Sequence, residues 1–127
     1  MPIITINLPA AIWENNGTLN DYTCLDSLKD KYGVYIFKNL ASKEVLYIGE
    51  ARSQTLKERI TQNFTENDTG GTFRNSFMTQ KNKLFGDLKS LLENTQLIAI
   101  TMEPNMLIRA LESVLIHTQN PTYNTDK

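Results

Sequence analysis

The sequence predicts an α+β domain in which a β-hairpin and one further strand are flanked by helices. Two short segments rich in Val, Ile, Tyr and Phe, 32–38 and 44–49, are separated by a hairpin-length connection. A third segment of this kind, 96–101, follows later in the chain. Both faces of the hairpin are apolar, and residues 105–117 are apolar nearly all round, which is typical of a largely buried helix. We therefore expect helices to cover both faces of the strands.

Length and composition indicate one globular domain. The chain has 127 residues, which is enough for one substantial core and too few for two ordinary domains. Its apolar runs are far shorter than the ~18 residues that a membrane span needs, so we expect no membrane partner. A single cysteine, Cys24, excludes an intrachain disulfide and a multi-cysteine zinc site, and it fits a reducing, cytoplasmic location.

The N-terminal segment carries the weaker signals. Residues 1–10 alternate in a way that is compatible with a short strand, which Pro9 would end. Asn15-Asn16-Gly17 is a turn signal, and residues 26–31 favour a short helix that leads into the hairpin. We interpret residues 1–31 as an N-terminal extension packed on the domain that follows.

The hairpin brings two tyrosines together. If its connection centres on Ala41, Tyr35 faces Tyr47 across the two strands. The tyrosine face then carries Tyr35, Phe37, Val45 and Tyr47, and the opposite face carries Val34, Ile36, Leu46 and Ile48. We expect the tyrosine pair to be exposed, which suits a site better than it suits stability. A slip of one residue would separate the two phenols.

Helices are predicted on both sides of a flexible loop after the hairpin. Residues 55–64 begin with a capping box made by Thr55 and Glu58. The loop occupies residues 66–71, and residues 73–93 form one or two helices. The side chains expected to point inward are Leu56, Ile60 and Phe64 on the first helix, and Leu84, Leu88, Leu91 and Leu92 on the later ones.

Glu112 is an unusual residue for its place in the chain. On the predicted final helix its neighbours one turn away are aliphatic, so its carboxylate emerges from an apolar stripe. An unpaired buried carboxylate is costly. Its charge must be neutralised by protonation, by an arginine such as Arg109 or Arg59, or by a cation. A structural ion pair is therefore the alternative to a site.

The charge of the chain is unevenly distributed. A net charge of −1 argues mildly against a nucleic-acid partner. Residues 29–89, however, hold eleven Lys and Arg against seven Asp and Glu, whereas the rest of the chain holds two against seven. A locally basic surface can therefore form on this acidic chain, although solvated charges are the commoner explanation.

Considered together, these segments resemble the GIY-YIG nuclease superfamily over about residues 32–124. The matching segments are Gly33-Val34-Tyr35 and, after eleven intervening residues, Tyr47-Ile48-Gly49, followed by Leu56-Lys57-Glu58-Arg59, Leu111-Glu112-Ser113 and Pro121-Thr122-Tyr123-Asn124. The resemblance implies a small three-stranded antiparallel sheet packed by helices. It also implies that residues 32–127 are a nuclease domain, with residues 1–31 as its extension.

The resemblance implies Mg²⁺-dependent endonucleolytic hydrolysis of DNA that leaves 5′-phosphate and 3′-hydroxyl ends. Glu112 would bind the metal, and Mn²⁺ can substitute. Arg59 would hold the scissile phosphate and stabilise the charge gathering on it. Tyr35 would take a proton from the attacking water or assist that step, and Tyr47 would hydrogen-bond the water or the phosphate.

Four further residues are interpreted as substrate-binding or supporting: Gly49, Lys57, Asn63 and Asn124. Gly49 lets the strand end where the substrate approaches, and Asn124 can tie the tail to the site. At the position of Asn63 the superfamily generally carries histidine or tyrosine. An amide cannot relay a proton as those groups can, so a proton-shuttling role there is in doubt.

Two alternatives to an enzyme stay open. The chain can be a catalytically weak or inactive module that binds DNA or a protein, which Asn63 and the near-neutral charge favour. It can also be a structural or regulatory partner in a larger complex, with the N-terminal segment as a docking strand. For the nuclease, the expected partners are duplex or branched DNA and a protein that supplies specificity.

Overall fold

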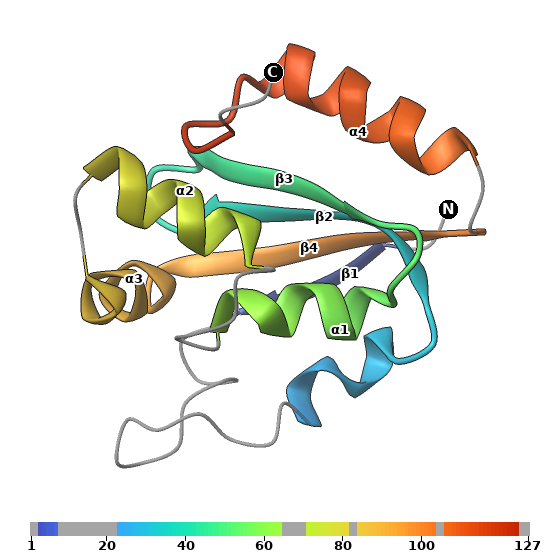
Figure 1. Ribbon diagram of the computed structural model, residues 1–127, viewed down its shortest axis with the longest axis horizontal. Coiled ribbons are helices and arrows are strands. Elements are labelled where there is room, and N and C mark those ends of the chain that lie inside the picture. Colours follow the sequence, from blue (N-terminus) through green and yellow to red (C-terminus); the bar gives the residue numbers. More distant parts are fainter. Residues whose placement is uncertain (1–2, 8–22, 65–70, 82–83, 104–105, 125–127) are drawn as a thin grey trace.

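A computed structural model describes residues 3–7, 23–64, 71–81, 84–103 and 106–124, and its centre is a four-stranded antiparallel sheet (Figure 1). The strand order is β1-β4-β2-β3, with bounds β1 (Ile3–Asn7), β2 (Tyr32–Asn39), β3 (Val45–Ala51) and β4 (Thr95–Met102). The α-helices are α1 (Leu56–Thr61), α2 (Thr72–Lys81), α3 (Phe85–Leu92) and α4 (Met106–Gln119). Two 3₁₀ helices, η2 (Thr23–Leu28) and η3 (Gln62–Phe64), complete the described elements.

Helices cover both faces of the sheet, as the sequence predicts (Figure 1). Helices η2, α1, α2 and α3 contribute to a core on the face that carries Tyr35 and Phe37. Helix α4 packs on the other face, against Val34, Ile36 and Ile48. The sheet is therefore a shared wall between two apolar clusters, and a residue on α4 can meet one on α1 only around an edge of the sheet.

The expectation of three strands is wrong by one. Strand β1 lies within the N-terminal segment predicted at 1–10 and pairs with β4, with Ile3 opposite Ile100. A local alternation pattern does not reveal its partner, because that partner lies at the far end of the chain. The short helix predicted at 26–31 forms slightly earlier, as η2, and the turn signal at 15–17 lies outside the described residues.

The hairpin register differs from the predicted one by two residues. Tyr35 lies opposite Gly49, and Tyr47 lies opposite Phe37. Because two is an even number, the shift keeps both tyrosines on the same face of the sheet. Their ring centroids are 6.4 Å apart, so the pair is diagonal rather than directly opposed.

Two separate single-residue shifts produce this register. The first arises at the connection, where the N–H of Asn39 donates to the carbonyl oxygen of Glu44 at 2.8 Å. The second is a β-bulge next to Lys38, which pairs with Val45. The bulge also exchanges the faces predicted for two residues, because Leu46 packs on the tyrosine side and Val45 packs on the α4 side.

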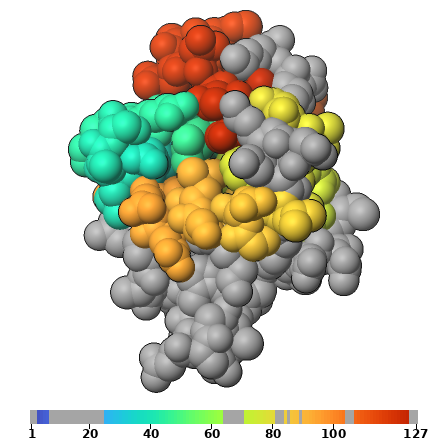
Figure 2. All heavy atoms as spheres, turned by 90° about the vertical axis from the view of Figure 1, so that its left-hand side faces the viewer, coloured from blue at the N-terminus to red at the C-terminus, as the bar shows by residue number. Residues whose placement is uncertain are grey.

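The bulge turns two consecutive carbonyl groups of β3 towards its outer edge, where they accept hydrogen bonds from residues 122 and 123. In a regular strand successive carbonyl groups point to opposite edges. Here the N–H groups of Thr122 and Tyr123 donate to the carbonyl oxygens of the consecutive residues Val45 and Leu46, at 3.1 and 2.8 Å. Figure 2 shows the red segment that follows α4 between the teal hairpin and the yellow helix α2.

Asn124 completes this edge by acting as a strand partner for one residue. Its Oδ1 accepts from the N–H of Ile48 at 2.9 Å, and its Nδ2 donates to the carbonyl oxygen of Ile48 at 2.8 Å. Tyr123 beside it packs against Phe73 and Phe77, with ring centroids 5.8 and 5.3 Å apart. Residues 122–124 therefore satisfy backbone groups that an edge strand would otherwise leave open.

The first helix after the hairpin follows its prediction closely. The N–H of Glu58 donates to Thr55 Oγ1 and the N–H of Thr55 donates to Glu58 Oε1, which confirms the capping box. These hydrogen bonds from Thr55 lower the pKa of Glu58. Leu56 and Ile60 are fully buried, as expected, and the Phe64 side chain lies outside the described residues.

Helix α4 is less buried than its composition predicts. Leu107 and Val114 are 59% and 57% exposed, whereas Ile108 is fully buried. The reason is that α4 lies on the outside of the sheet, and no described element covers its other side (Figure 1). No described helix is long and apolar enough to span a membrane.

Leu84 is exposed, which contradicts the prediction that it points inward. It precedes α3, and its N–H donates to Asp87 Oδ2 at 2.9 Å, so it belongs to the cap of that helix rather than to its inner face. Leu88 and Leu92 are buried as predicted.

We predict that Asn124→Ala lowers the free energy of unfolding by about 2–3 kcal/mol, because it leaves the N–H and C=O of Ile48 without partners. Urea unfolding followed by circular dichroism would measure this change. Gln119→Ala, at an exposed position on α4, is the matched control and should change stability by less than ~0.5 kcal/mol. An Asn124→Ala variant as stable as the wild type would contradict the edge-capping role.

Candidate active site

The ring of Tyr35 lies across Gly49, its cross-strand partner on the edge strand β3. A Cβ atom at residue 49 would lie 2.3 Å from Cζ of Tyr35 and 2.4 Å from its hydroxyl oxygen, so only glycine leaves room for the ring. Because Tyr35 belongs to an inner strand, crossing Gly49 carries its hydroxyl group to the edge of the sheet. Gly49 is therefore required for the position of this phenol, and its contact with substrate stays a prediction.

A threonine hydroxyl joins the two phenols. The hydroxyl of Tyr47 donates to Thr72 Oγ1 at 2.7 Å, and the Thr72 side chain also hydrogen-bonds Tyr35. Thr72 is the first residue of α2. A threonine at a helix start is ordinary in sequence, so no local signal connects it with the hairpin, and it was not among the predicted site residues.

Tyr35 is buried, with 1% of its surface exposed, which contradicts the expectation of an exposed tyrosine pair. Tyr47 is only partly buried. Burial is the main cause that raises the pKa of Tyr35 well above its ordinary value, and the neighbouring Tyr47 adds to it. The charge of Arg59 and the hydrogen bond with Thr72 act in the opposite direction. Tyr35 is therefore a neutral phenol at pH 7.

Arg59 reaches the same group of residues from the last turn of α1. Its Nη1 donates to Gln62 Oε1 at 3.1 Å, which holds the guanidinium at the edge of the buried stripe. Its positive charge lowers the pKa of both Tyr35 and Glu112. Arg59 therefore lies within electrostatic reach of a phenol on one face of the sheet and a carboxyl group on the other.

Glu112 reaches the site from α4, and its charge is felt by Tyr35. Burial and then the charge of Glu50 raise its pKa to about 7, while Arg109, Arg52 and Arg59 lower it. Within the described part of the chain, its carboxyl group forms no hydrogen bond or ion pair. Neither arginine proposed from the sequence is therefore a direct partner of Glu112.

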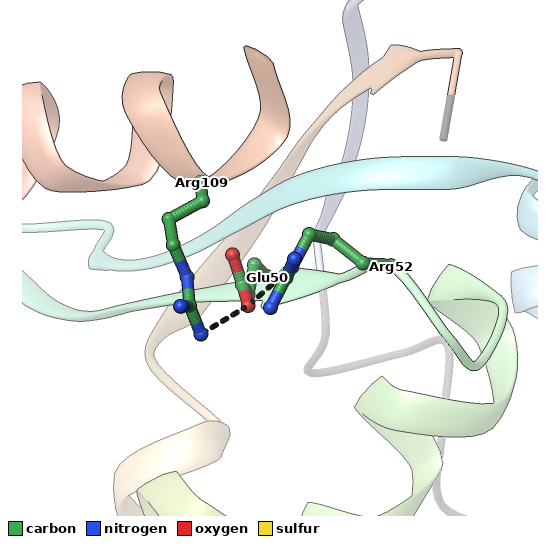
Figure 3. A network of polar contacts seen from close by, with 3 residues as sticks. All are labelled: Glu50, Arg52 and Arg109. Carbon is green, nitrogen blue, oxygen red and sulfur yellow. Dashed lines mark hydrogen bonds and ion pairs between the residues drawn. The ribbon is translucent and has the colours of Figure 1, made fainter. Parts of the chain in front are cut away.

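Glu50 contacts two arginines, Arg52 and Arg109 (Figure 3), and all three charges act on Glu112. Its Oε1 accepts from Arg52 Nε at 2.8 Å and lies 3.7 Å from Arg109 Nη2. Its Oε2 is buried and has no hydrogen-bond partner among the described residues. Glu50 was not among the predicted site residues, although its place next to Gly49 on an alternating strand puts it on the α4 side of β3.

Three other predicted residues are engaged in holding the fold around the site. Lys57 pairs with Asp26 of η2. Asn63 is buried, and its Oδ1 accepts from the N–H of Arg74 at 3.1 Å in the first turn of α2, while its Nδ2 has no partner among the described residues. Asn124 ties the end of the chain to β3, as one reading of the sequence suggested. Direct contacts of these residues with substrate stay predictions.

The oxygen donors suit one weakly caged divalent cation. Among the residues that the structure describes, the Glu112 carboxyl group has no hydrogen-bond or ion-pair partner, and one buried oxygen of Glu50 is unpaired. The described residues contain no group of three or more histidine, cysteine or acidic side chains that could enclose a metal ion. Mg²⁺ commonly binds through one or two carboxylates and keeps several waters, so this donor set fits Mg²⁺ and does not fit an all-protein cage.

Comparisons with known proteins agree with this arrangement. A family model described as a UvrC-like GIY-YIG domain matches residues 31–125. The UvrABC system protein C of Fervidobacterium nodosum is 33% identical over 104 residues, which cover 82% of this chain. The matched region spans 15% of the length of that relative, so the similarity concerns one part of a larger protein.

We predict that Glu112→Gln stabilises the metal-free protein above pH 7. A carboxyl group with a folded pKa of about 7 and an unfolded pKa near 4.5 keeps its proton longer in the folded state. Wild-type stability therefore falls as the pH rises from about 4.5 to 7 and stays low above this range. Glutamine does not titrate, and after discounting for solvent screening its advantage should reach about 1 kcal/mol.

Urea unfolding of both proteins in chelator, at pH 5 and at pH 8, would measure this difference. The free energy of unfolding of the variant, relative to that of the wild type, should be higher at pH 8 than at pH 5. A variant that is markedly less stable than the wild type at pH 8 would show instead that Glu112 belongs to a structural ion pair.

Proposed function

The chain belongs to the UvrC-like GIY-YIG domain family, and on this premise we propose that it is an endonuclease that hydrolyses phosphodiester bonds in DNA. The observation that supports the proposal is that Arg59 and Glu112 both act electrostatically on Tyr35, whose ring lies against Gly49 of the edge strand β3. Because a relative is a named component of the UvrABC system, we also propose that a protein partner supplies specificity.

Glu112 is the proposed ligand of a single Mg²⁺, for which Mn²⁺ can substitute. A carboxyl group whose pKa is near 7 releases its proton to a cation at neutral pH with little cost. The unpaired oxygen of Glu50 makes that residue a second donor, directly or through water. A bound Mg²⁺ would supply positive charge for the oxygen that leaves the phosphate.

Arg59 is proposed to hold the scissile phosphate. A planar guanidinium presents two parallel donors to a phosphate, and its charge stabilises the negative charge that gathers during attack. Its position on a short helix with a confirmed capping box fixes the direction from which it approaches. Lysine at this position would keep the charge but lose the paired donors.

The two phenols are proposed to orient the attacking water. The hydroxyl group of Tyr47 donates to Thr72 Oγ1, and a phenol oxygen can also accept a hydrogen bond from the attacking water. Burial and then the neighbouring Tyr47 raise the pKa of Tyr35, and the charge of Glu112 adds a smaller effect, so Tyr35 stays protonated without a nearby cation. A cation at Glu112 would remove this smaller effect and, together with Arg59 and Thr72, would favour the phenolate.

A binding module without catalysis is the second candidate. Two observations favour it: Tyr35 is buried, and the Asn63 amide caps a helix instead of facing an open site. Such a module would grip DNA through its arginines, and its affinity would fall steeply with salt.

We predict that the wild-type chain nicks DNA only when Mg²⁺ is present, and that Glu112→Ala and Arg59→Ala lower the rate by about 10²-fold or more. A supercoiled plasmid, a branched duplex and a single strand would serve as substrates. Glu93→Ala, at an exposed position after α3, is the matched control and should cut like the wild type. Salt-sensitive binding without cutting on all three substrates would contradict catalysis and support the binding module.

We predict that Thr72→Val lowers kcat about tenfold with little change in KM, because it removes the hydrogen bonds that orient the phenols. The loss of a contact that lowers the pKa of Tyr35 should also move the rising limb of the kcat–pH profile to higher pH. Thr72→Ser keeps the hydroxyl group and should restore both. If Thr72→Val is less stable than the wild type but the rising limb of its kcat–pH profile is unchanged, the role of Thr72 is structural.

A further inference from the structure

We propose that Arg52 and Arg109 form a second phosphate-binding site, which takes backbone phosphates of DNA next to the scissile one. This inference rests on the proposed nuclease function and extends it, because cleavage as described above needs only Arg59 at a phosphate. The two arginines come from different layers of the fold: Arg52 directly follows β3, and Arg109 lies on α4 (Figure 3).

Glu50 contacts the two arginines from the protein interior, and their guanidinium groups face the solvent. Both guanidinium groups meet the same oxygen of Glu50, whose side chain is 18% exposed, while those of Arg52 and Arg109 are 40% and 69% exposed. The carboxylate is therefore the inner part of the network, and the nitrogen donors are the outer part. An approaching phosphate meets arginine before it meets Glu50.

Most of the hydrogen-bond donors of these arginines have no partner in the described part of the chain. Arg52 Nε donates to Glu50 Oε1 at 2.8 Å, and the two terminal nitrogens of Arg52 have no partner among the described residues. Arg109 lies 3.7 Å from the same oxygen, which is an ion-pair distance rather than a hydrogen bond. A phosphate can therefore take two parallel donors from either arginine without breaking a hydrogen bond in the protein.

The local charge also favours a phosphate. Arg52, Arg59 and Arg109 all act on Glu112, and Glu50 is the other acidic group acting there. The three arginines thus outnumber the two carboxylates at this place, although the whole chain has a net charge of −1. A cation held by Glu112 would increase the surplus. The surface around these arginines is therefore locally positive on an acidic protein, which favours binding of the phosphate backbone of DNA.

The other explanation of this network is a structural clip between β3 and α4. A clip and a phosphate site differ in what the removal of an arginine changes. Loss of a clip lowers stability and leaves the salt dependence of DNA binding alone. Loss of a phosphate contact weakens binding to all sequences and removes about one released counterion per arginine.

The test is fluorescence anisotropy with a labelled DNA duplex in chelator, so that no cutting occurs, over a series of salt concentrations. Arg52→Gln and Arg109→Gln should each weaken binding about fivefold or more and lower the slope of log Kd against log salt by about 1. The double variant should lower the slope by about 2. Lys43→Gln removes a charge from the exposed hairpin connection, at the other end of β3, and should leave the slope unchanged.

The outcomes separate this proposal from the function on which it rests. A wild-type chain that neither binds nor cuts DNA removes the nuclease proposal and this site with it. A wild-type chain that cuts DNA, with both arginine variants binding at an unchanged salt slope, overturns the phosphate site alone. Urea unfolding of the same variants identifies the clip, since only the clip predicts lost stability with unchanged binding.

Discussion

The close approach of the Tyr35 ring to Gly49 is the constraint on which the arrangement of the site depends. The sheet separates two helical layers, and the proposed metal ligand, Glu112, belongs to one layer while Tyr35 faces the other. A side chain on an inner strand reaches the sheet edge only by lying over its neighbour on the edge strand. The absent side chain at residue 49 provides this passage, and any Cβ atom there would meet the phenol. The glycine thus leaves room for the Tyr35 ring across the edge strand, where the charges of Arg59 and Glu112 act on it.

The hairpin explains why an incorrect register still placed the tyrosines on one face. The connection adds one residue of shift and the bulge adds another, so the parity of the strand is restored beyond the bulge. With either shift alone, Tyr47 would point towards α4. The bulge has a second effect, since it aims two consecutive carbonyl groups at the end of the chain. One irregularity therefore serves both the site and the closure of the edge.

The sequence predicted those features whose signals are local or belong to a family motif. The capping box at Thr55, the helices on both sides of the sheet and the family assignment are of this kind. The bulge, the pairing of β1 and the hydroxyl bridge at Thr72 depend on partners that are distant in the chain, and no window of sequence contains both members. The burial of Tyr35 was missed for a similar reason: exposure is decided by which helices arrive later, and a strand pattern cannot show them.

The clasp between Asn124 and Ile48 has a consequence for synthesis on the ribosome. Asn124 follows Ile48 by 76 positions in the sequence, so the outer edge of β3 stays open until that later segment has been synthesised. Glu112 also follows the hairpin in the chain, so the hairpin is made before the proposed metal ligand exists. The order of synthesis therefore delays assembly of the proposed site until α4 and the clasp have both left the ribosome.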